Sequence, residues 1–188
     1  MTEQEWLVST DPTPMLEFLR GKVSDRKFRL FGVACSRRKW SSLSERQQQF
    51  LGGFERLAEE QITDPMVLGA LGDPLESAQE TSDSVARENA KEDEGPALAA
   101  ERRQQAGLLL DIFGNPFRPV TLNPAWRTSN VTALAQAIYD DRAFDRLPIL
   151  ADALEDAGCD NADILGHCRQ PGEHVRGCWV VDLVLGKE

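Results

Sequence analysis

The spacing of the apolar residues is the feature of this sequence that most restricts its fold. Between Gly and Pro breaks, large apolar side chains recur every three or four residues, as they do along one face of an α-helix. Phe28, Phe31 and Cys35 form one such face, and Val131 and Ala135 begin another. No repeat of fixed length relates these segments. The sequence therefore predicts an all-α fold, either a helical bundle or a short α-solenoid-like array, with about eight to ten helices.

Changes in composition along the chain divide it into three parts. Residues 1–72 and 97–188 carry the apolar helical pattern, whereas residues 73–96 are rich in Glu, Asp and Ser and have few large apolar side chains. A segment of that composition buries little surface, so we expect a solvated helix or a linker there. The prediction is an N-terminal helical bundle over residues 1–72, an acidic segment over residues 73–96, and a C-terminal helical unit over residues 97–188.

Some predictions concern single helices. A helix over residues 42–63 is expected to bury Phe50 in its apolar stripe and to kink or break at Gly52–Gly53, because Gly costs about 1 kcal/mol relative to Ala within a helix. A short helix is expected over residues 66–71. The apolar ending at residues 178–185 fits a buried helix or a short strand, and its helical neighbours favour the helix.

The charges are distributed unevenly. The net charge is −10, yet residues 20–40 hold eight basic side chains against Asp25, and residues 73–101 hold nine acidic side chains against two basic ones. The acidic total argues against a nucleic-acid partner, because neutralising phosphates needs clustered Lys and Arg. The basic segment is better suited to pairing with an acidic protein partner, or with the acidic segment of the same chain.

Nothing in the sequence indicates a membrane or a secreted protein. The longest apolar runs are too short to span a bilayer, and the start lacks the basic and apolar regions of a signal peptide. Four cysteines in 188 residues are too few for a disulfide framework. We therefore expect a cytoplasmic protein with free thiols and no membrane partner.

The end of the chain holds an unusual concentration of metal-binding residue types. Both histidines and three of the four cysteines lie within 21 residues, and the candidate ligands are Cys159, His167, Cys168, His174 and Cys178. If residues 173–185 form a helix, the side chains at positions 174 and 178 project from the same face and can reach one ion. Zinc accepts any mixture of thiolate and imidazole, so it is the possible cofactor, although no Cys-x-x-Cys pair is present.

Two other interpretations fit the same residues. Cys168 or Cys178 could be a nucleophile with His174 as its base, activated by Arg169 or Arg176 nearby. Alternatively, the thiols are simply small buried apolar side chains, because free Cys is among the most buried residue types. The positions of the sulfur and nitrogen atoms distinguish these interpretations.

Three stretches of sequence carry a resemblance to known proteins. They are EWLVSTDPTPMLEFLRGKVSDRK near the start, NPFRPVTLNPAW in the middle, and HCRQPGEHVRGCWVVDLVLGKE at the end. Together they resemble a family of uncharacterised bacterial proteins that occurs as many paralogues in some genomes. The resemblance implies that the acidic segment is the part that varies between paralogues, and it supplies no catalytic residue.

These observations favour a non-enzymatic role. We expect an α-helical protein-interaction or regulatory module that presents helical surfaces to a protein partner. The alternative is a small metal- or thiol-dependent enzyme that uses the C-terminal Cys/His cluster.

Overall fold

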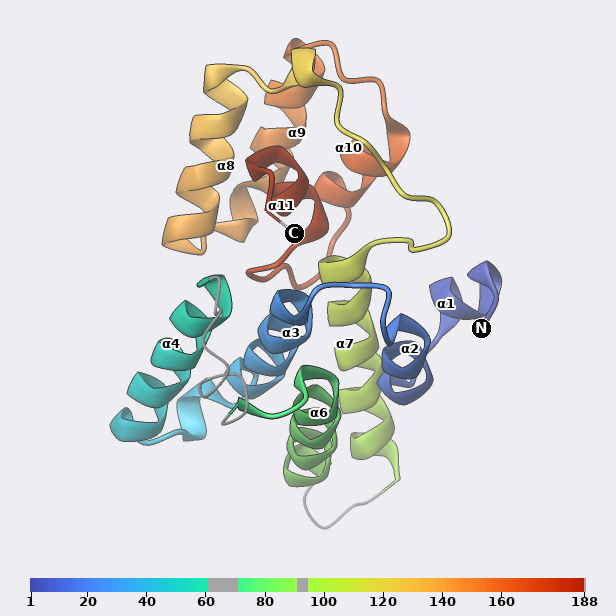
Figure 1. Cartoon of the computed structure of the whole chain (residues 1–188), viewed down its shortest axis with the longest axis vertical. Coiled ribbons are helices and arrows are strands. Elements are labelled where there is room, and N and C mark those ends of the chain that lie inside the picture. Colours follow the sequence, from blue (N-terminus) through green and yellow to red (C-terminus); the bar gives the residue numbers. More distant parts are fainter. Residues whose placement is uncertain (61–70, 91–94, 188) are drawn as a thin grey trace. The chain divides into compact units, whose positions relative to one another are not determined.

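The computed structural model describes residues 1–60, 71–90 and 95–187. Within these ranges the regular structure consists of ten α-helices and three short 3-10 helices without any strand, which confirms the predicted all-α fold (Figure 1). The chain forms two compact units, residues 1–110 and residues 111–188. Among the described helices, none has both the length and the apolar character needed to cross a bilayer.

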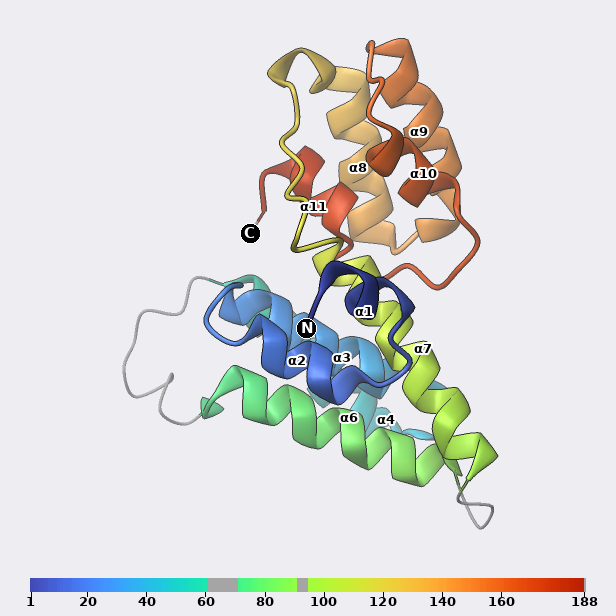
Figure 2. The ribbon, with the colours of Figure 1, turned by 90° about the vertical axis from the view of Figure 1, so that its right-hand side faces the viewer.

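The N-terminal unit is built around helix α3. This helix packs along α4 and α6 and buries Phe31 and Leu30, and Figure 2 shows α2, α3 and α6 side by side. Sequence signals set the helix starts: Thr2 and Glu5 form a capping box at α1, and the Asp11 side chain caps α2. The helices of this unit are α1 (Glu3–Val8), α2 (Pro12–Leu19), α3 (Asp25–Arg37), η1 (Trp40–Ser42), α4 (Glu45–Glu59), α6 (Pro74–Ala90) and most of α7 (Pro96–Phe113).

The acidic segment contains a packed helix and is not a linker over residues 74–90. Helix α6 buries Leu75, Ala78, Val85 and Ala86 against the rest of the N-terminal unit. Small side chains let two helices approach closely, so this helix packs against α3 with only a few large apolar residues among them. The boundary between the units lies after Leu110, and not near residue 97 as the composition suggests.

Helix α4 differs from its prediction in two ways. It continues through Gly52–Gly53 without a break, and Phe50 is 74% exposed instead of buried. The buried face contains Leu51, Glu55 and Ala58, which is rotated by one position from the expected stripe. A purely apolar criterion misses this face because one of its members is a carboxylate. The expected helix over residues 66–71 lies almost entirely outside the described residues.

The basic side chains of the N-terminal unit pair with acidic side chains of the same unit. On α3, Arg37 lies 2.7 Å from the Glu55 carboxylate of α4. After α3, Arg38 lies 2.7 Å from Glu101 of α7, and Lys39 pairs with Glu88 of α6. Part of the uneven charge distribution is therefore compensated within the unit.

The C-terminal unit has its own core. Helices α8 and α9 lie side by side in both views, and α10 and α11 pack against them (Figures 1 and 2). The core includes Ile138, Leu150 and Val181, each with no exposed surface. Pro148 stands in the first turn of α9, where its missing N–H costs nothing. The helices are α8 (Ser129–Asp141), α9 (Leu147–Asp156), α10 (Ala162–Arg169) and α11 (Trp179–Leu185), with 3-10 helices η2 (Pro124–Trp126) and η3 (Phe144–Arg146).

Candidate metal centre

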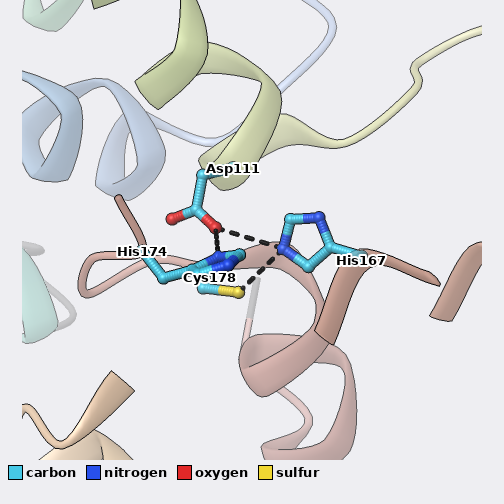
Figure 3. Close-up of side chains that lie close together, drawn as sticks. All are labelled: Asp111, His167, His174 and Cys178. Carbon is cyan, nitrogen blue, oxygen red and sulfur yellow. Dashed lines mark hydrogen bonds and ion pairs between the residues drawn. The ribbon is translucent and has the colours of Figure 1, made fainter. Parts of the chain in front are cut away.

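Four polar side chains from four segments of the C-terminal unit meet in its interior. Asp111 lies in the last turn of α7, His167 near the end of α10, His174 in the loop that follows, and Cys178 at the N-cap of α11. Their side chains point toward one another (Figure 3). The side chains of Asp111 and the two histidines are at most 8% exposed, and Cys178 has no exposed surface. The group is therefore shielded from bulk water.

The donor atoms converge on a common centre. Asp111 Oδ1 lies 2.6 Å from His174 Nδ1 and 3.1 Å from His167 Nε2, and that same Nε2 lies 3.2 Å from Cys178 Sγ. One ligand atom from each of the four residues lies within 4.8 Å of the others. In a tetrahedral zinc site with bonds of about 2.0 Å to N or O and 2.3 Å to S, neighbouring ligand atoms are about 3.3–3.6 Å apart. The three contacts given above, at 2.6–3.2 Å, are somewhat shorter than this spacing, and all four ligand atoms lie within 4.8 Å of one another.

The segment before α11 is a loop and not the expected helix over residues 173–185. Helix α11 begins at Trp179, and Gly177 has φ +94°, a left-handed conformation that other residues rarely adopt. Arg176 fixes the loop to α8, because its Nε donates to the backbone carbonyl of Tyr139 at 3.1 Å. The i, i+4 argument for His174 and Cys178 is therefore wrong, although the fold still brings these two residues together.

Two contacts orient the ligand groups from outside the cluster. The backbone N–H of Val175 donates to Asp111 Oδ2 at 2.9 Å, which leaves Oδ1 directed at the histidines. The side-chain amide of Gln170 lies 3.1 Å from His167 Nδ1, the ring nitrogen that faces away from the cluster. Hydrogen bonds of this kind hold metal ligands in position in known metal sites.

The electrostatics of the group favour opposite charges on its members. Burial raises the pKa of Asp111, but hydrogen bonds and charge from His167 and His174 outweigh this effect and lower the pKa overall. Burial lowers the pKa of His174, and its hydrogen bond to Asp111 reverses the shift and raises that pKa. Burial, with a further contribution from Asp111, raises the pKa of Cys178 well above its usual value. In the absence of a cation, the thiol is therefore protonated.

The arrangement does not suit a cysteine nucleophile. In a catalytic triad the thiol and the carboxylate contact different ring nitrogens, so that the imidazole relays a proton between them. The predicted base, His174, directs Nδ1 at Asp111, and its buried Nε2 has no hydrogen-bond partner in the described structure, so no thiol contacts that nitrogen. Cys178 instead faces Nε2 of His167, the same nitrogen that Asp111 contacts. The thiol is also fully buried, and a nucleophilic cysteine needs access and a lowered pKa. Convergence on one centre is the pattern of a metal site.

The structure brings together His167, His174 and Cys178 of the five ligands predicted from the sequence. Cys159 and Cys168 lie in the apolar core of the unit and are not members of the converging group. Burial raises the pKa of Cys159, and it raises the pKa of Cys168 to about 12, as expected for thiols among apolar side chains. Their placement agrees with the interpretation of these two thiols as small buried residues.

Sequence reasoning missed Asp111, which is 56 residues before His167. One signal could have identified it. Asp111 is the single charged residue in the apolar run from Gly107 to Phe113, at the end of a long helix. A carboxylate in such a run is buried, and a buried carboxylate needs a positively charged or hydrogen-bonding partner.

Comparisons of the chain with family models, with curated proteins and with solved structures found no match. The resemblance to the paralogue-rich bacterial family therefore stays a prediction. The interpretation of the site depends on its geometry alone.

Proposed function

We propose that the C-terminal unit binds one zinc ion through Asp111, His167, His174 and Cys178, and that the ion orders this unit of a non-enzymatic helical protein. One observation carries the proposal: four buried ligand atoms of three chemical types lie within 4.8 Å of one another. Burial of four unlike polar groups is costly unless something compensates them. A divalent cation compensates all four at once.

The ligand set favours zinc over the hard cations. Magnesium and calcium prefer six or more oxygen ligands, whereas this group offers one carboxylate, two imidazoles and one thiolate. Zinc accepts such a mixture in tetrahedral geometry. Copper binds similar groups more tightly on the basis of intrinsic affinity, so the elemental analysis must distinguish the two ions.

The closed character of the group favours a structural role. Catalytic zinc sites keep one position for water or substrate, whereas structural sites use four protein ligands. Here four protein side chains are available, and the surrounding unit shields them from water. A bound ion would join the end of α7, helix α10, the loop before α11 and the start of α11.

Elemental mass spectrometry of the untagged full chain tests this function. We expect about one zinc per chain in the wild type, and less than a tenth of that in Cys178→Ser or His174→Ala. Cys35→Ser, which changes a buried thiol of the N-terminal unit, is the matched control and should retain the metal. Cys168→Ser should also retain it, because that thiol is outside the converging group.

Cobalt substitution provides a second test that does not depend on yield. A cobalt–thiolate charge-transfer band should appear in the wild type and in Cys168→Ser, and should be absent in Cys178→Ser. Absence of metal from wild-type protein after incubation with zinc would contradict the proposal. So would a Cys178→Ser variant that binds zinc as the wild type does.

A separate observation supports a protein partner for the N-terminal unit. The Phe50 ring is 74% exposed and stacks on Phe54, with ring centroids 6.4 Å apart, at the wall of an apolar groove of about 750 Å³. We propose that this aromatic pair contacts the apolar face of a helix in a partner protein. A photo-crosslinking amino acid at position 50 should capture one defined protein in cells, and a Phe54→Ser change should abolish the product. Equal capture by the protein that keeps Phe54 and by the Phe54→Ser variant would contradict this role.

A further inference from the structure

We infer that Gln170 is a positioning residue of the metal centre, which holds the His167 imidazole in place through Nδ1 in both of its tautomers, so that Nε2 stays directed at the ion. The inference depends on the proposed zinc site and adds a specific role for a residue outside the ligand set. Its side chain contacts the far side of the imidazole, where Gln170 Nε2 and His167 Nδ1 are 3.1 Å apart.

A neutral histidine carries one proton on either of its two ring nitrogens. Nε2 of His167 faces the cluster, so metal binding requires the lone pair on Nε2 and the proton on Nδ1. Without metal, Nε2–H can donate to Asp111 Oδ1 at 3.1 Å, and Nδ1 then accepts a hydrogen bond. The partner of Nδ1 must therefore accept a hydrogen bond in the metal-bound state and donate one in the metal-free state.

A side-chain amide can serve both states. Its N–H group donates to an unprotonated Nδ1, and after the amide turns over, its Oε1 accepts from Nδ1–H. Turning the amide exchanges two atoms of similar size and leaves the rest of the residue in place. Gln170 can therefore follow the change of tautomer when the ion binds, and a group that only accepts would fix the metal-binding tautomer permanently.

Three variants separate this role from a structural one. Gln170→Glu keeps the shape and only accepts at neutral pH, so it should bind zinc at least as tightly as the wild type. Gln170→Leu keeps the size but cannot hydrogen bond, and should weaken zinc binding about tenfold, the low end for outer-shell contacts because residue 170 is exposed. Gln136→Leu, which removes an exposed amide from α8 of the same unit, should change nothing.

The measurement is a zinc titration in competition with a chromophoric chelator, together with long-range ¹H–¹⁵N NMR of the His167 ring. In the wild type the spectra should show the proton on Nε2 without zinc and on Nδ1 with zinc. In Gln170→Glu the metal-free protein should already show the proton on Nδ1.

Equal zinc affinities for Gln170→Leu and the wild type would overturn the inference, as would equal weakening by the Glu and Leu variants. In either case wild-type zinc binding would leave the proposed function intact. Failure of the wild type to bind zinc would instead remove the proposed function, and the inference with it.

Discussion

The substitution Asp111→Asn tests how much the cluster stabilises the metal-free protein. Asp111 accepts three hydrogen bonds through two oxygens, from His167, from His174 and from the backbone N–H of Val175. The Asn side chain has the same shape but one acceptor oxygen, so it cannot accept from the two imidazoles and from the Val175 N–H at the same time. At least one hydrogen bond to a charged group is lost, and the others lose their charge assistance.

The expected magnitude follows from that count. A hydrogen bond to a charged group contributes about 1.5–3 kcal/mol, and a buried donor without a partner costs a similar amount. Because the imidazoles can change tautomer to accept from the amide, the two penalties do not add fully. We therefore expect the free energy of unfolding of the C-terminal unit to fall by about 2–4 kcal/mol in the metal-free protein.

Urea denaturation of chelator-treated protein, followed by circular dichroism and tryptophan fluorescence, measures this change. The midpoint should decrease without a change in the slope. Asp160→Asn, an exposed carboxylate in the same unit, is the matched control and should change stability by less than about 0.5 kcal/mol. An Asp111→Asn protein as stable as the wild type would show that the buried network contributes nothing.

The pH dependence and a packing contact give two further predictions. Burial lowers the pKa of His174, but the hydrogen bond and charge of Asp111 outweigh burial and raise this pKa above its unfolded value of about 6.5. The stability that the His174–Asp111 pair contributes is therefore complete below about pH 6.5, and it is lost as the pH rises through the raised pKa of the folded state. Metal-free protein should therefore lose stability as the pH rises above about 6.5, whereas zinc-bound protein should gain stability because metal ligands must be deprotonated. Urea midpoints that change with pH in the same way with and without zinc would contradict the site. Gly114→Ala should destabilise by about 1–3 kcal/mol, since φ is +62° and a Cβ would lie 3.1 Å from the indole of Trp179. Gly158→Ala has φ +88° in open space and measures the backbone cost alone, so equal thermal shifts for the two variants would exclude the packing effect.

The sequence predicted the helical class well because helix signals are local. Caps, Pro positions and apolar spacing act within a few residues, as at the capped starts of α1 and α2 and at Pro148 in the first turn of α9. The buried face of α4 was missed because Glu55 belongs to it, paired with an arginine 18 residues away. The packing of α6 was missed because its buried face combines Leu75 and Val85 with Ala and Ser, whereas the prediction looked for a stripe of large apolar residues.

The candidate site was predicted in part for the same reason. His167, His174 and Cys178 lie within twelve residues, so their crowding is visible in the sequence. Their geometry was predicted from a helix that is in fact a loop, because the turn at Gly177 was not recognised. Asp111 joins them only through tertiary packing, which no local pattern encodes.

The separation of Asp111 from the other three ligands has a consequence for folding. The unfolded chain already offers a short chelating segment from His167 to Cys178, so zinc can bind it before the unit forms, and binding to the unfolded state reduces the stability that the ion adds. Asp111 can reach the ion only after a loop of more than fifty residues has closed. If the proposed ion binds, the Asp111 carboxylate is the ligand that distinguishes the folded chain from the unfolded one.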